Sequence, residues 1–168
     1  AMRGEFLTAY VGDPHGDLGK YQALFEFQSM MGELVGMEVV GPPSYDGIGA
    51  AASAIAMAGR ITGRSSAILA GPIGRECGMQ IKNFLKPVMN LKETGSDRTT
   101  GSTDPIWLGN MISKDTAAVF LEIPNFLGAI ESQIEKLAEI THTAGALLIV
   151  GVDPLSLGIL SAPAAYGA

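Results

Sequence analysis

Two apolar runs in the last third of the sequence constrain the fold more than any other feature. Residues 116–123 (TAAVFLEI) and 146–152 (ALLIVGV) are almost continuously apolar, and an amphipathic segment at 130–143 separates them. Runs of this length and composition are typical of strands that are buried on both faces of a parallel sheet. The order predicts a strand–helix–strand unit, in which a right-handed crossover joins two parallel strands.

The preceding sequence continues this alternation of helical and strand patterns. We expect helices at 17–35, 46–61, 75–85 and 106–112, and short strands at 37–40, 67–70 and 88–91. The polar, aperiodic stretch at 93–105 (ETGSDRTTGSTDP) is expected to form an exposed loop. These elements predict an α/β protein with three layers, a mostly parallel sheet and a single domain that spans residues 1–168. We also expect the 168 residues to be a piece of a longer protein.

Composition and charge narrow the classes of function. The net charge is −6 with 11 Lys and Arg residues, and no basic patch is visible, which argues against nucleic-acid binding. The most apolar window, 144–160, is interrupted by glycines, Asp153 and Pro154, so no bilayer-spanning segment is predicted. One cysteine, Cys77, fits a protein of the reducing cytoplasm. A hydrophobic fraction of 47% fits doubly buried strands or a large surface shared with a partner.

The acid that follows the last strand, Asp153, is the first candidate site residue. Ligands of open α/β sheets bind at the carboxyl ends of the strands, so a carboxylate there is placed to bind a cationic ligand atom. Alternatively, Asp153 opens a turn with Pro154, because Asp-Pro is a common turn opener. The pattern leaves both interpretations open.

A second candidate lies at the start of the alanine-rich helix, in SYDGIGA (residues 44–50). Free backbone N–H groups at a helix start bind anions such as phosphate, which would make Ser44 and Asp46 part of a cofactor site. The simpler interpretation is that one of these residues caps the helix. We favour capping, because the carboxylate of Asp46 would repel a phosphate.

Other polar residues offer weaker evidence. Glu122 and Asn125 lie at and just after the end of the strand at 116–123. They either line the mouth of a pocket or, for Asn125, shape a turn. His15 lies near two acids in an N-terminal loop, but nothing fixes a metal-binding geometry. The sequence contains no Ser-His-Asp arrangement, Cys/His metal motif or glycine-rich phosphate loop. We therefore assign no catalytic residue and no metal ligand, and a nucleotide-binding domain is disfavoured.

Four blocks resemble one known family. They are YQALFEFQSMMGELVGMEVV, SYDGIGAAASAIAMAGRITGR, DTAAVFLEIPNFLGAIES and AEITHTAGALLIVGVDPLSLGILSAPAAYGA. Together they look like the P-protein of the glycine cleavage system (decarboxylating glycine dehydrogenase), and specifically like the first (α) subunit of its split form. The resemblance covers about residues 5–168. It is most specific in the C-terminal block and weakest over residues 71–105, where AGPIGRECG replaces a histidine-containing segment of the family.

The resemblance implies a large-domain core of the aspartate-aminotransferase-like fold type I of pyridoxal-phosphate (PLP) enzymes, here incomplete. The complete enzyme decarboxylates glycine with PLP as electron sink and passes the aminomethyl group to the lipoyl arm of the H-protein. Asp153 corresponds to the carboxylate that holds the pyridine nitrogen, whereas the Schiff-base lysine belongs to the second (β) subunit. We therefore expect a cytoplasmic, catalytically inactive partner of that subunit. The alternative is an interaction module without a ligand site.

Overall fold

The computed structural model describes residues 18–168, with side chains from residue 21 onward. It forms two units, the first ending at Pro43 and the second spanning Ser44–Ala168, which are described separately. The single domain expected for residues 1–168 therefore stays a prediction. His15 and the predicted start of the first helix at Asp17 lie outside the described residues.

The first unit contains one long helix, α1 (Leu18–Val35). Gly36 ends it with a positive φ of 73°, a conformation that glycine adopts without steric cost. The strand expected at 37–40 is wrong, because these residues have no strand partner. Instead, the Met37 amide donates to Gly32 O at 3.1 Å, and the Gln28 side-chain amide donates to Val40 O.

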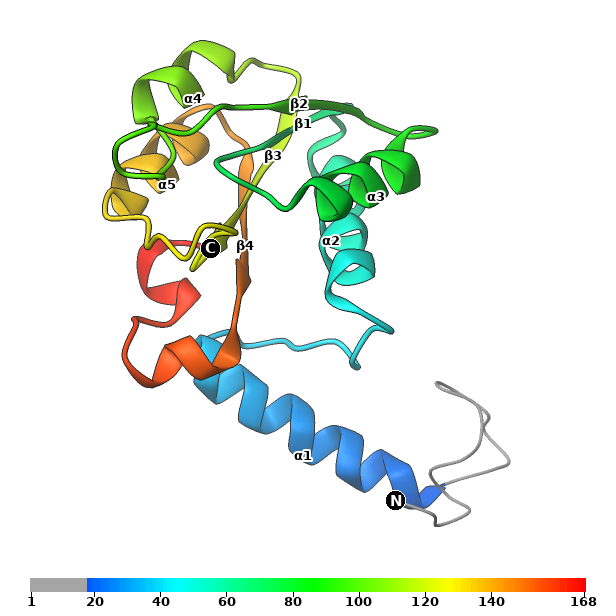
Figure 1. Cartoon of the computed structure of the whole chain (residues 1–168). Coiled ribbons are helices and arrows are strands. Elements are labelled where there is room, and N and C mark those ends of the chain that lie inside the picture. The colour runs from blue at the N-terminus through cyan, green and yellow to red at the C-terminus, as the bar shows by residue number, and fades with distance from the viewer. Residues whose placement is uncertain (1–17) are drawn as a thin grey trace. The chain divides into compact units, whose positions relative to one another are not determined.

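The second unit is built on a sheet of four parallel strands (Figure 1). The strands are β1 (Ser66–Leu69), β2 (Asn90–Glu93), β3 (Thr116–Ile123) and β4 (Leu147–Val152), in the order β2-β1-β3-β4. The predictions for β3 and β4 are confirmed to within one residue. β2 begins two residues later than expected, because the amides of Val88 and Met89 still donate to Leu85 O at the end of the preceding helix.

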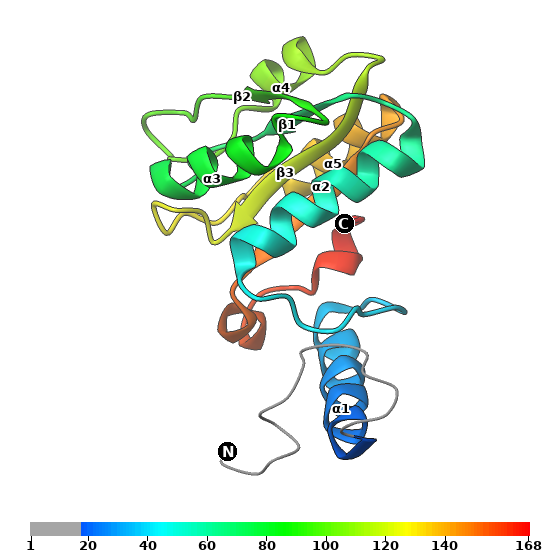
Figure 2. The ribbon, with the colours of Figure 1, turned by 90° about the vertical axis from the view of Figure 1, so that its right-hand side faces the viewer.

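Helices cover both faces of this sheet. Figures 1 and 2 show α2 (Gly47–Thr62) and α3 (Arg75–Leu85) on one face, with α4 (Pro105–Met111) and α5 (Ile134–Thr143) on the other. Alternate side chains of each strand enter two separate cores: Leu69 and Phe120 face α2 and α3, and Ile68 and Leu121 face α4 and α5. The predicted three-layer α/β fold is confirmed.

The carboxyl ends of β3 and β4 lead into loops and short helical turns. Helix α5 begins at Ile134 rather than at residue 130, because Glu131 is held by hydrogen bonds to Thr103 in the loop after β2. After β4 the chain forms two 3₁₀ helices, η2 (Pro154–Gly158) and η3 (Pro163–Tyr166). Among the described residues, no helix combines the length and apolarity that crossing a membrane requires.

Candidate functional site

A cavity of about 790 Å³ lies in the second unit, where the carboxyl ends of β3 and β4 face the beginning of α2. The small side chains of α2, including Ala50, Ala51 and Ala54, form part of its wall. The chain leaves β1 toward α3 on one face and β3 toward α5 on the other, so the sheet reverses its winding between these strands. Ligands of open α/β sheets bind beside this reversal point, which makes the cavity the candidate site.

Three carboxyl groups line the cavity, and each comes from a different element. Asp46 precedes α2, Glu122 belongs to β3 and Asp153 follows β4. None of the described residues that line the cavity is Lys, Arg or His. The fold thus brings together Asp46, Asp153 and Asn125, which the sequence had singled out separately. Ser44 is not among the lining residues, and its hydroxyl donates to Asp46 O at 3.0 Å.

Asp46 caps helix α2. Its Oδ1 accepts a hydrogen bond from the Gly49 amide at 2.6 Å, and its backbone is extended, as an N-cap requires. The predicted capping role is confirmed. Because the carboxylate occupies the position where an anion would bind the helix start, this end of α2 presents negative charge to the cavity.

Asp153 has a similar local role at the end of β4. Its Oδ1 accepts the Leu155 amide at 3.0 Å, while its carbonyl accepts the Ser156 amide and hydroxyl at 2.9 and 2.7 Å. These bonds open η2 and confirm the turn interpretation. The side chain is nevertheless exposed and borders the cavity, and its ligand-binding role stays a prediction.

The side chain of Asn125 forms hydrogen bonds that hold the loop between β3 and α5. It is 7% exposed, and its Nδ2 donates to Gly101 O at 2.9 Å. Its Oδ1 accepts the amides of Leu127 and Ala129 at 3.0 and 3.1 Å. The turn-shaping interpretation is confirmed, because these bonds engage both ends of the side-chain amide.

Glu122 differs from these residues because no strong hydrogen-bond donor from the described residues reaches it. It is half-buried, and Cys77 Sγ on α3 lies 4.0 Å from its Oε1. Gly151, its partner on β4, leaves it room: a Cβ there would lie 3.3 Å from Glu122 Cγ. Burial raises the pKa of the Glu122 carboxyl. Burial and the charge of Glu122 together raise the pKa of the Cys77 thiol.

The sequence interpretation missed Glu131, a buried carboxylate just before helix α5. It is 3% exposed; both oxygens accept the Thr103 amide, at 3.1 and 3.0 Å, and Oε1 also accepts the Thr103 hydroxyl at 3.1 Å. Gly71, with φ of 78°, packs against this pair: a Cβ there would lie 2.6 Å from Thr103 Oγ1. Glu131 therefore ties together the loops after β1, β2 and β3. In the sequence it looks like one acid in the first turn of a predicted helix.

Comparison with known proteins identifies the family. The family model of the glycine cleavage system P-protein matches residues 2–168. A protein of Koribacter versatilis, "Probable glycine dehydrogenase (decarboxylating) subunit 1", is 42% identical over 96% of this chain and 37% of its own length. The chain thus spans little more than a third of that relative.

Solved structures agree with this assignment. A crystal structure of glycine decarboxylase (P-protein) of the glycine cleavage system, in inhibitor-bound form, is 38% identical with a TM-score of 0.87 over 99% of this chain and 37% of that chain. A putative O-acetylhomoserine (thiol)-lyase of Campylobacter jejuni that carries pyridoxyl-lysine phosphate is 21% identical, with a TM-score of 0.60 over 84% of this chain and 33% of that chain. This last likeness shows the shared fold type I architecture alone. The chain belongs to the glycine cleavage system P-protein family.

Proposed function

We propose that this chain is part of the first subunit of decarboxylating glycine dehydrogenase. In the proposal, the complete enzyme decarboxylates glycine with PLP and passes the aminomethyl group to the lipoyl arm of the H-protein. The second subunit supplies the Schiff-base lysine, and this chain is inactive alone. The main support is the 42% identity to a glycine dehydrogenase subunit 1 across almost the whole chain.

The residues around the cavity do not fit PLP by themselves. Covalent attachment requires a lysine, and the cofactor's phosphate requires cationic groups or free amides. No lysine, arginine or histidine occurs among the described residues that line the cavity, and Asp46 already accepts a hydrogen bond from the start of α2. This mismatch supports the proposal that the groups needed to hold the cofactor come from outside the part of the chain that lines the cavity, with the second subunit as their source.

Within the proposal, Asp153 is the strongest of the four candidate cofactor-binding residues. Within the part of the chain that the structure describes, only one of its carboxylate oxygens accepts a hydrogen bond, which leaves the other for a cationic ring nitrogen or for a donor of the second subunit. Asn125 and Asp46 are engaged in local structure, and Ser44 lies outside the cavity lining. We therefore assign these three residues a supporting role.

The proposal is tested by adding PLP to the chain alone and to a complex of the complete first subunit with the second subunit, with lipoylated H-protein present as the acceptor. We expect a visible absorbance band that borohydride abolishes, together with release of labelled CO₂ from glycine, only in the complex. A borohydride-sensitive band in the chain alone would contradict the inactive role. A complex that neither forms nor releases CO₂ would contradict the assignment to this enzyme.

A second candidate is an interaction module without a ligand site. The hydrogen bonds of Asp46 and Asn125 within the chain favour this candidate. They show that much of the polar lining of the cavity already stabilises the local structure. Replacing Asp153 with Asn in the assembled complex discriminates between the two. An unchanged kcat/KM for glycine favours the module, whereas a loss of tenfold or more favours a completed ligand site.

A further inference from the structure

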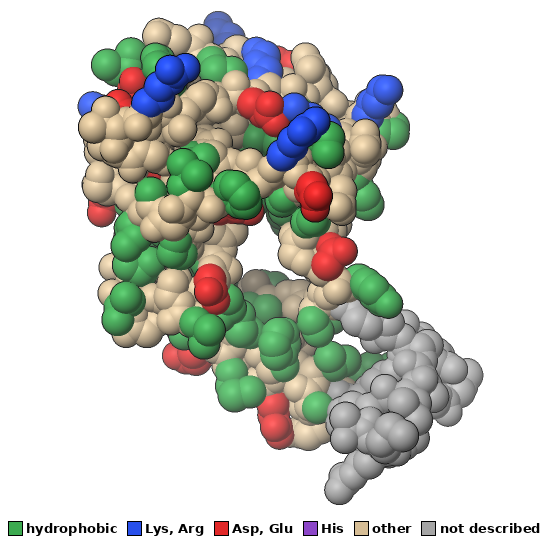
Figure 3. Space-filling view, in the orientation of Figure 1, with side chains coloured by type: hydrophobic (Ala, Val, Ile, Leu, Met, Phe, Trp, Pro, Cys, Tyr) green, Lys and Arg blue, Asp and Glu red, His purple; other side chains and the backbone are tan. Residues whose placement is uncertain are grey.

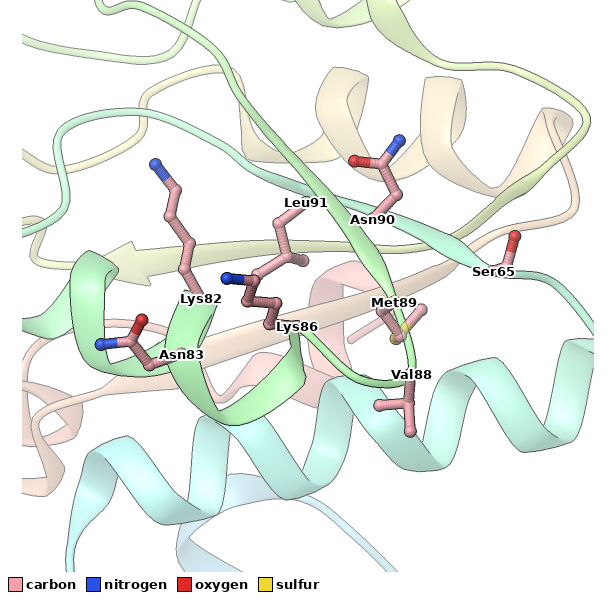
Figure 4. Close-up of a pocket in the computed structure, with 8 residues that line it drawn as sticks. All are labelled: Ser65, Lys82, Asn83, Lys86, Val88, Met89, Asn90 and Leu91. Atoms are coloured by element: carbon pink, nitrogen blue, oxygen red, sulfur yellow. The ribbon is translucent and has the colours of Figure 1, made fainter.

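A groove follows the outer edge of the sheet, between strand β2 and the second half of helix α3. It encloses about 550 Å³. Figure 4 shows Lys82, Asn83 and Lys86 projecting from α3 and its end, and Asn90 and Leu91 lying along β2. Among the described residues, β2 has one neighbour in the sheet, β1, and its other edge faces the groove.

The backbone of β2 has hydrogen-bonding groups at this edge that no described residue pairs with. The amides of Asn90 and Thr94 donate to Ser65 O and Leu69 O, at 2.8 and 3.0 Å. Because alternate residues of a parallel strand direct their backbone groups to the same neighbour, Leu91 and Glu93 direct theirs away from β1. Edge groups of this kind are a template for a further strand.

The surroundings of this edge carry positive charge, although the chain as a whole has a net charge of −6. In Figure 3 the Lys and Arg side chains gather over the region of α3, β2 and α4. Lys82 forms an ion pair with Glu93 at 2.8 Å, whereas Lys86 and Lys92 have no ion pair within the part of the chain that the structure describes. An acidic partner would complement these two charges.

Lysines on an edge strand also discourage unwanted strand pairing, so charge alone does not argue for a partner. Two features go beyond that protective role. The groove beside the edge has a volume of about 550 Å³, and the apolar side chains of half-buried Leu91 and of Val88, which is 62% exposed, contribute to its lining. A protective edge requires neither feature.

We propose that the β2 edge binds an extended acidic segment of a partner protein as a fifth strand. The added backbone pairs with Leu91 and Glu93, acidic side chains contact Lys86 and Lys92, and an apolar side chain packs against Leu91 and Val88. This docking site is independent of the proposed glycine dehydrogenase function, because no residue of the cavity at the β3 and β4 ends takes part.

The test uses the whole 168-residue chain and a fluorescein-labelled peptide of Glu residues with one central Val, acetylated and amidated, so that Glu side chains occur on both faces of the added strand. Binding is followed by fluorescence anisotropy. We expect saturable binding, at least tenfold weaker when Lys replaces Glu in the peptide or when alternate peptide nitrogens are methylated. Hydrogen exchange of the Leu91 and Glu93 amides should slow on binding, which attraction to lysines alone does not produce.

Charge reversal of the protein supplies the matched comparison. Lys86→Glu and Lys92→Glu should each weaken binding severalfold, while Lys136→Glu on exposed α5 should leave it unchanged; circular dichroism checks the fold of each variant. Absence of binding, an equal loss in Lys136→Glu, or unchanged exchange at Leu91 and Glu93 with peptide bound would overturn the proposal. So would light scattering that shows a dimer through this edge, because the occupant would then be a second copy.

Discussion

Glu122 and Glu131 lie on either side of the loop that follows β3, and their surroundings are opposite. Glu131 is almost fully buried and accepts hydrogen bonds from the amide and hydroxyl of Thr103. Glu122 is half-buried and borders the cavity, and among the described residues the one hydrogen-bonding group that approaches it is the Cys77 thiol, 4.0 Å away. The more deeply buried carboxylate is therefore the better satisfied one.

The contrast distinguishes a carboxylate that stabilises the fold, Glu131, from one that can still bind a ligand, Glu122. A buried charge is stable when donors surround it, and its main role is then to fix the groups that donate. A partly buried carboxyl without strong donors keeps its hydrogen-bonding capacity for a ligand. If burial were the only criterion, Glu131 would be the stronger candidate for ligand binding, although its hydrogen-bonding capacity is already used within the chain.

The largest effect that tests this contrast is expected for Glu131→Ala. It leaves the Thr103 amide and hydroxyl unsatisfied in a buried place, so we expect the free energy of unfolding to fall by about 3 kcal/mol. Urea denaturation followed by the fluorescence of Trp107, the single tryptophan, measures this. Glu135→Ala, on the exposed side of the first turn of α5, is the control and should change stability by less than about 0.5 kcal/mol. Equal effects of the two variants would refute the structural role of Glu131.

Asn125→Ala should have the next largest effect, a loss of about 2 kcal/mol, because three hydrogen bonds of the β3–α5 loop disappear. The same denaturation assay applies, with exposed Asn83→Ala as control. Asn125→Asp retains the oxygen that accepts the Leu127 and Ala129 amides and should recover part of the loss. If Asn125→Ala is as stable as the parent chain, the loop does not depend on this side chain.

The fold and the site differ in how far the sequence predicts them. The periods of apolar residues predicted β3 and α3 with their observed bounds, because buried strands and amphipathic helices carry their pattern locally. Capping by Asp46 and the turn at Asp153 were also predictable, since both depend on neighbouring residues. The bond between Thr103 and Glu131 joins residues 28 positions apart, and no local pattern encodes it. The same limit applies to Glu122, whose exposure and partners depend on α3 and β4.

Asp153→Asn extends the comparison to a third carboxylate. We expect the free energy of unfolding to change by less than about 0.5 kcal/mol, because asparagine also caps helices well and the side chain is exposed. Thermal unfolding of the isolated chain measures this. A loss above about 2 kcal/mol would mean that Asp153 belongs with Glu131 as a structural residue, contrary to its exposed position.

Glu122→Gln is expected to have the smallest effect and to act in the opposite direction. Burial raises the pKa of Glu122 above its ordinary value of 4.5, so the folded state binds the proton more tightly than the unfolded state. Well below pH 4.5 the carboxyl is protonated in both states and the penalty is absent; as the pH rises through 4.5 and then through the folded pKa, the folded state loses stability. Glutamine cannot ionise, so the variant should be more stable at pH 7 by a few tenths of a kcal/mol (~0.3), the size expected for a half-exposed group.

Two measurements check the sign of this effect. The difference in Tm between Glu122→Gln and the parent chain should appear at pH 7 and vanish near pH 3, whereas Glu139→Gln on the exposed face of α5 should show no such pattern. Because the charge of Glu122 helps to raise the pKa of the Cys77 thiol, the variant should also react faster with iodoacetamide at pH 8, as the thiolate is the reactive form. A lower Tm at pH 7 together with an unchanged alkylation rate would mean that Glu122 is satisfied by its surroundings as Glu131 is, and the distinction between the two carboxylates would fail.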